Sequence, residues 1–162
     1  MRPAVLAAAL VLLACGGAPV TGGRTPTAGA LPAGFSGDRV ARIQAEIDWL
    51  RATSGFLSLV LTDTSDSAKD GLNRYVQFLG GQPGPLFAEA SIRKGNGPNL
   101  SDADTIAALG KLGFSTPDAG HPNYWNAQIT APSHDVAVMV ETIFIQVFKA
   151  SPAYQLDVRR GT

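Results

Sequence analysis

The side chains best suited to acid–base or metal chemistry are two histidines and three neighbouring aspartates. His121 lies in a Gly–Pro turn and His134 in the first turn of an expected helix, so neither has the spacing typical of a metal site. Asp63, Asp66 and Asp70 are three and four residues apart, but the glycine and terminal glutamate of an EF-hand do not follow them. We therefore predict no metal site and no cofactor.

The serines give no recognisable nucleophile. The chain has no G-x-S-x-G motif, and Ser54-Gly55 is typical of a turn that ends a helix. The segment 95–98 is rich in glycine but lacks the Lys and Ser/Thr of a phosphate-binding loop. The sequence therefore favours a non-enzyme. A catalytic site assembled from scattered Ser, Asp and His residues stays open as an alternative.

Cys15 is the only cysteine, and its surroundings predict covalent lipid attachment. A positive charge at Arg2 precedes an apolar stretch from Val5 to Leu13, which is too short to span a bilayer and is typical of a secretory signal. The run that ends at Cys15 resembles the lipobox of bacterial lipoproteins, in which the cysteine is lipidated and becomes the new N-terminus. A plain secretory signal cut elsewhere is the competing interpretation.

These features predict three regions. Residues 1–14 form a lipoprotein signal peptide, residues 15–35 a flexible tether rich in Gly, Pro and Thr, and residues 36–162 a single domain. As a flexible coil, the 19 residues from 16 to 34 would reach roughly 25 Å, which would hold the domain just clear of a bilayer. We expect export from the cytoplasm to the bacterial cell envelope and membrane anchoring through an N-terminal lipid such as palmitate.

The charge balance excludes one class of partner. The chain contains 13 basic and 13 acidic residues, with no cluster of lysine and arginine beyond Arg159-Arg160 near its end. Because nucleic-acid binding depends on a basic patch that displaces counterions, we predict no nucleic-acid partner.

The domain begins with an expected helix over residues 37–52. An apolar stripe recurs at steps of three and four residues, and Ser36 is placed to cap it; the stripe comprises Val40, Ile43, Ile47 and Leu50. Three strands over residues 56–62, 73–79 and 86–92 follow with short links, which predicts an antiparallel meander. In the second strand Val76 and Phe78 share one face, and Tyr75 and Gln77 share the other.

The remaining elements complete an α+β domain. A short helix is expected after a capping box of Ser101 and Asp104, with Gly113 as its C-terminal cap. A strand over 123–129 places Trp125, Ala127 and Ile129 on one face, and a long apolar helix and an extended piece over 154–158 follow. We predict an antiparallel sheet of about four to five strands with helices packed mainly on one face.

Parts of this sequence resemble a known family of small domains. The likeness lies in Leu112-Gly113-Phe114, in Pro117, in Pro122-Asn123-Tyr124-Trp125 and in the long helix that ends at Val147-Phe148. These segments resemble the TY-Chap domains, which are related to YbjN proteins and type III secretion chaperones. The resemblance implies a helix–sheet–helix fold that binds a peptide or protein partner without catalysis.

A partner surface is expected on the sheet face that the helices leave open. We predict that Tyr75, Gln77, Tyr124 and Asn126 form a mixed aromatic and polar surface there, which would bind a peptide or protein segment. Docking on this face or pairing with an edge strand would serve a chaperone-like envelope lipoprotein. An ordinary solvated sheet face, or an envelope hydrolase or small-ligand-binding lipoprotein, are the alternatives.

Overall fold

The computed structural model describes residues 30–62, 71–80 and 84–162. Helix α1 (Gly37–Ala52) begins after Ser36, whose hydroxyl accepts the Arg39 N–H at 3.4 Å. Its apolar stripe is buried, as the sequence predicts, at Val40, Ile43, Ile47 and Leu50. The expected helix over residues 37–52 is confirmed.

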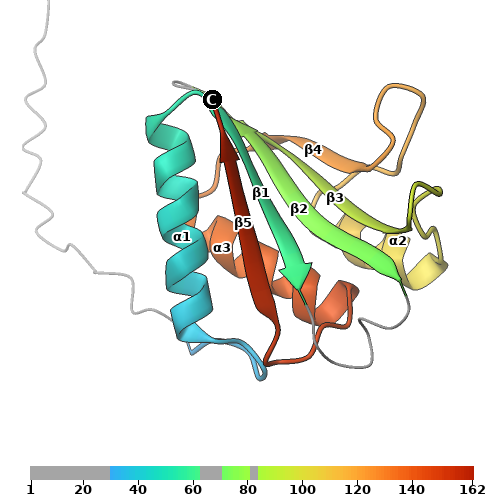
Figure 1. The fold of residues 1–162 in the computed structure, drawn as a ribbon, viewed down its shortest axis with the longest axis horizontal. Coiled ribbons are helices and arrows are strands. Elements are labelled where there is room, and N and C mark those ends of the chain that lie inside the picture. Colours follow the sequence, from blue (N-terminus) through green and yellow to red (C-terminus); the bar gives the residue numbers. More distant parts are fainter. Residues whose placement is uncertain (1–29, 63–70, 81–83) are drawn as a thin grey trace, which may run out of the picture. The chain divides into compact units, whose positions relative to one another are not determined.

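The sheet has five strands in the spatial order β4-β3-β2-β1-β5, and every neighbouring pair is antiparallel (Figure 1). The strands are β1 (Gly55–Thr62), β2 (Leu72–Gly80), β3 (Leu86–Lys94), β4 (Tyr124–Ile129) and β5 (Gln155–Gly161). The predicted meander β1–β2–β3 is confirmed. The C-terminal strand β5 returns to pair with β1 at one edge of the sheet, while β4 forms the other edge.

The helices lie on one side of this sheet. Helix α2 (Ala103–Lys111) and helix α3 (Ser133–Thr142) follow β3 and β4, and α3 continues as the π-helical turn η2 (Ile143–Val147). In Figure 1, α3 passes behind the strands. Apolar side chains of α1, α3 and η2 join the strands in one core. The predicted α+β class, with helices packed mainly on one face, is therefore confirmed.

Strand register divides the sheet side chains into a covered and an open face. Leu57, Phe78 and Ala88 are direct cross-strand partners, and all three are fully buried beneath the helices. Because side chains alternate along a strand, the residues next to them in sequence point to the open face. This alternation confirms the predicted faces of the second strand.

The two ends of α2 differ in how well the sequence predicts them. The capping box of Ser101 and Asp104 is wrong, because Asp102 is the N-cap and accepts the Thr105 N–H at 2.9 Å and the Thr105 hydroxyl at 2.7 Å. The predicted C-terminal cap at Gly113 is confirmed by its positive φ of 84°. Its N–H donates to Gly110, and the next N–H donates to Leu109, which is a Schellman motif.

A β-bulge in β4 overturns the predicted face of that strand. Ala88 pairs with Asn126 and Leu86 with Ile129, so three steps along β4 match two steps along β3. Trp125 consequently lies on the open face opposite Glu89, while Ile129 is buried with the core. The expectation that Trp125, Ala127 and Ile129 share one face is wrong, because strict alternation does not survive an inserted residue.

A buried carboxylate joins the start of α1 to α3 and to the segment before β5. Glu141 is 0% exposed and accepts Arg39 Nη2 at 2.6 Å and the Ser36 N–H at 3.2 Å. The Tyr154 hydroxyl also donates to Glu141. Burial and contact with this carboxylate raise the pKa of Tyr154 far above its ordinary value. Desolvation lowers the pKa of Arg39, but the hydrogen bonds and charge of Glu141 outweigh it and raise that pKa overall.

Candidate functional site

The open face of the sheet carries a continuous line of large apolar side chains, here called the apolar row, which comprises Phe56, Leu79 and Phe87. These residues are direct cross-strand partners on β1, β2 and β3. Phe56 is 43% exposed and Leu79 is 51% exposed, whereas Phe87 is half-buried. Toward β5, Phe56 lies against Gly161, where an added Cβ would be 2.0 Å from the ring. The apolar row therefore crosses most of the sheet.

An aromatic stack extends this row toward β4. The ring centres of His121 and Trp125 lie 4.4 Å apart, and the two ring planes are inclined at 26°. The ring centre of His121 lies 5.9 Å from that of Phe87. Asp118 fixes the loop, because its carboxylate accepts the N–H groups of Gly120 and His121 at 2.8 Å. These bonds also lower the pKa of Asp118. The geometry makes His121 a packing residue of the open face.

Beside the apolar row lies a hydrogen-bonded group, the polar network, which comprises Tyr75, Gln77, Glu89, Arg93 and Asn123. The Asn123 amide donates to the Tyr75 hydroxyl and to Glu89 Oε2, each at 3.2 Å. Gln77 Nε2 donates to the same Glu89 oxygen, and Arg93 Nη2 donates to the Tyr75 hydroxyl at 3.1 Å. Two of the predicted site residues, Tyr75 and Gln77, are thus joined on the open face.

A buried asparagine supports this network from the side. Asn99 Oδ1 accepts the Ile92 N–H at 2.8 Å, and Asn99 Nδ2 donates to Asn123 Oδ1 at 3.1 Å and to the Pro122 carbonyl at 2.7 Å. Asn99 and Asn123 are both buried. Because each amide is held by several partners, the polar groups that face the open side keep fixed positions.

The structure separates the other two predicted site residues from this face. Tyr124 is only 1% exposed, lies opposite Ala90 on the covered face, and donates its hydroxyl to the Leu100 carbonyl at 2.8 Å. Asn126 pairs with Ala88 and shares that covered side. The expectation that Tyr124 and Asn126 form one surface with Tyr75 and Gln77 is wrong. In β4, the residues on the open face are offset by one position from the prediction, so Trp125 lies on the open face instead of Tyr124.

Sequence reasoning also missed several open-face residues. Phe87 and Glu89, on the open face of β3, are not among the predicted site residues. The cross-strand alignment of Phe56 with Leu79 depends on a register that no local pattern gives. The alternation of Leu86, Ala88 and Ala90 against Phe87 and Glu89 is the signal that could have identified the latter pair.

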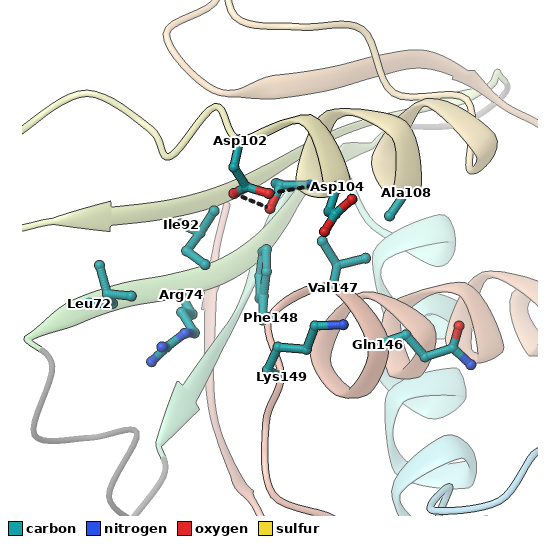
Figure 2. Close-up of a pocket in the computed structure, with 11 residues that line it drawn as sticks. Leu72, Arg74, Ile92, Asp102, Asp104, Ala108, Gln146, Val147, Phe148 and Lys149 are labelled. Atoms are coloured by element: carbon teal, nitrogen blue, oxygen red, sulfur yellow. Dashed lines mark hydrogen bonds between the residues drawn. The ribbon is translucent and has the colours of Figure 1, made fainter.

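A separate pocket of about 320 Å³ lies on the helix side of the sheet, between α2, η2 and the ends of β2 and β3 (Figure 2). Apolar groups such as Ile92 and Phe148 line it together with Arg74, Asp102 and Lys149. Asp102 is already engaged by Thr105, and neither histidine lines this pocket. His134 instead lies at the surface, where its Nδ1 is 3.3 Å from Asp135 Oδ1.

The described residues contain no group of three or more His, Cys, Asp or Glu side chains that could hold a metal ion. In the same part of the chain, no helix has the length and apolar character needed to cross a membrane. Cys15 and the aspartates at 63, 66 and 70 lie outside the described residues, so the predictions made for them stay predictions.

Comparison with known proteins gives a family. The model of the TY-Chap3 family matches residues 38–161, and the family is described as "T3SS (YopN, CesT) and YbjN peptide-binding chaperone 3". This range includes all the helices and strands described above except the first residue of α1. No curated protein and no solved structure matches the chain. This chain belongs to the TY-Chap3 family of peptide-binding chaperone domains.

Proposed function

We propose that this protein is a non-catalytic, chaperone-like module that binds an extended segment of a partner protein on the open face of its sheet. The observation that carries the proposal is the exposed apolar row beside a fixed polar network. Membership of a family described as peptide-binding chaperones supports the same class of function. A small-ligand or hydrolytic function finds less support, because the pocket beside α2 brings no histidine to a carboxylate.

The apolar row offers the main source of binding energy. Phe56 and Leu79 are exposed on the inner strands β1 and β2, near one end of each strand. Covering apolar surface releases about 25 cal/mol per Å², so two such side chains and their neighbours can contribute several kcal/mol. Aromatic side chains bury a large area with few rotatable bonds, which is why they are enriched at protein interfaces.

The polar network supplies ordered hydrogen-bonding groups on the same face. Tyr75, Gln77 and Glu89 are held by amide donors and by each other, so a partner meets groups that are already ordered. Preorganised groups lose little conformational entropy on binding. An extended segment lying over β2 and β3 would therefore contact apolar and polar side chains at once.

The experiment that tests this proposal compares two exposed apolar residues. Leu79→Asp places a charge in the apolar row, whereas Ile106→Asp places the same charge on α2, where Ile106 is 37% exposed. We expect Leu79→Asp to weaken binding of peptides selected from a random library by at least about tenfold, and Ile106→Asp to leave it unchanged. Equal effects of the two variants, at unchanged thermal stability, would remove the open face as the binding surface.

The proposal includes a location. We propose that Cys15 is lipidated after removal of residues 1–14, so that the domain is tethered to a membrane of the bacterial cell envelope. The support is the order of features in the sequence, namely a positive start, a short apolar segment and a cysteine followed by a stretch rich in Gly, Pro and Thr. A tethered module of this kind would bind exported segments close to the membrane.

A further inference from the structure

We propose that Glu89 makes the open face selective for peptides that carry a lysine or arginine two residues from a large apolar side chain. This inference rests on the proposed peptide-binding function and names the chemistry of its partner. It depends on three observations: the hydrogen-bond partners of Glu89, the aromatic ring beside it, and its spacing from Phe87.

Glu89 differs from the other two glutamates of the described residues, Glu46 and Glu141. Glu141 pairs with Arg39 and Glu46 with Arg160, whereas the partners of Glu89 are the neutral amides of Gln77 and Asn123. No lysine or arginine in the described part of the chain forms an ion pair with Glu89. Both amides bond to Oε2. The carboxylate is thus positioned without being neutralised, and a cation from a partner would complete it.

The cation of the polar network, Arg93, contacts Tyr75 and forms no ion pair with Glu89. Arg93 donates to the Tyr75 hydroxyl at 3.1 Å, and its guanidinium lies 5.9 Å from the centre of the Tyr75 ring. Arg159, on β5 at the far edge of the same face, pairs with Asp157 at 2.8 Å. On the open face, Arg159 is therefore neutralised by Asp157, whereas Arg93 contacts the uncharged Tyr75 and Glu89 contacts uncharged amides.

An aromatic ring lies directly across from this carboxylate. Trp125 is the cross-strand partner of Glu89, and its ring stacks on His121 at 4.4 Å. The face of a tryptophan attracts a cation, and arginine uses this contact most often. The aliphatic part of a lysine or arginine side chain can also pack on apolar surface while its charged end reaches a carboxylate. Trp125 and Glu89 together suit a long basic side chain.

The spacing along β3 specifies the rest of the motif. Phe87 and Glu89 are two residues apart on one face, so their side chains repeat at the period of an extended strand, about 6.6–6.8 Å. A peptide that runs along β3 in extended form has the same period. Its side chains at positions i and i+2 would therefore meet the apolar row and Glu89 together.

The test measures peptide binding by fluorescence anisotropy with three matched peptides. They contain a central Leu-x-Lys, Leu-x-Gln or Leu-x-Glu in the same flanking sequence and are measured against wild type, Glu89→Gln and Asp104→Asn. Glu89→Gln keeps the shape and acceptor oxygen of residue 89 but removes its charge. Asp104→Asn removes a charge from an exposed position on α2 and serves as the matched control.

We expect wild type to bind the lysine peptide at least about fivefold more tightly than the glutamine peptide, and the glutamate peptide least tightly. Glu89→Gln should lose this preference while keeping its affinity for the glutamine peptide, and Asp104→Asn should retain the preference. Equal affinity of wild type for all three peptides, or a lysine preference that survives Glu89→Gln, would overturn the Glu89 inference alone. Binding of none of them to wild type, together with no effect of Leu79→Asp on selected peptides, would overturn the proposed function and this inference with it.

Discussion

Replacing Glu141 by glutamine should destabilise the domain far more than breaking an ion pair whose arginine is half-exposed. The Glu141 side chain is fully buried, and that of Arg39 is only 16% exposed. Glu141 accepts hydrogen bonds from Arg39, from the Ser36 N–H and from the Tyr154 hydroxyl. Glutamine offers one acceptor oxygen in place of two and turns an NH₂ group toward these donors. Arg39 would then remain largely buried without its counter-ion.

The expected magnitude follows from this geometry. Removing one partner of a buried ion pair costs about 3–5 kcal/mol, and the partial exposure of Arg39 places this case near 3 kcal/mol. With a urea dependence of about 1.5 kcal/mol/M, the unfolding midpoint should fall by about 2 M. Urea denaturation followed by circular dichroism measures this shift. Glu46→Gln is the matched control. Glu46 is also buried, but its partner Arg160 is 45% exposed, so water can solvate the unpaired arginine and the loss should be no more than about 1 kcal/mol.

A double variant separates the lost ion pair from lost packing. Glu141→Leu combined with Arg39→Met removes both charges and keeps apolar bulk, so it should be more stable than Glu141→Gln alone. A loss below about 1 kcal/mol for Glu141→Gln would refute the argument that this carboxylate holds α1, α3 and the segment before β5 together. A double variant less stable than Glu141→Gln would refute the assignment of that loss to an unpaired Arg39.

Two further predictions concern the membrane tether and the buried phenol. Cys15→Ala should move the protein from the membrane fraction to the soluble fraction of its host, as measured by immunoblotting of fractionated cells, and unchanged partitioning would remove the lipid anchor. Because the pKa of Tyr154 is raised in the folded state, its contribution to stability is complete below pH 10 and falls above it, by up to about 1.4 kcal/mol per pH unit. The unfolding free energy of Tyr154→Phe should therefore decline less steeply between pH 9 and pH 11 than that of wild type, and equal slopes would contradict the burial of a neutral phenol beside Glu141.

Local sequence patterns predict the elements that are determined by contacts between residues close together in the sequence. The stripe from Val40 to Leu50 gives α1 with its bounds, and Gly113 gives the end of α2, because both depend on contacts within one or two turns. The alternation of Tyr75 and Gln77 against Val76 and Phe78 gives two faces, because one side of β2 is buried along its length.

The rest depends on contacts between residues far apart in the sequence. The bulge in β4 is set by its pairing with β3, so alternation alone assigns the faces of Tyr124 and Trp125 incorrectly. The ion pair between Arg39 and Glu141 joins residues separated by 102 positions, and no local pattern marks either residue as buried. The same holds for the candidate site, where Asn123 reaches Tyr75 and Glu89 only after the sheet has formed.

Mapping where a bound peptide lies tests the central claim most directly. Backbone amide chemical shifts would be recorded for the domain with and without a peptide selected from a random library by binding. We expect the largest changes at open-face residues of β2 and β3, around Tyr75, Leu79 and Glu89, with little change around the pocket between α2 and η2. Changes concentrated at Gln146 and Lys149, with an undisturbed open face, would contradict the account.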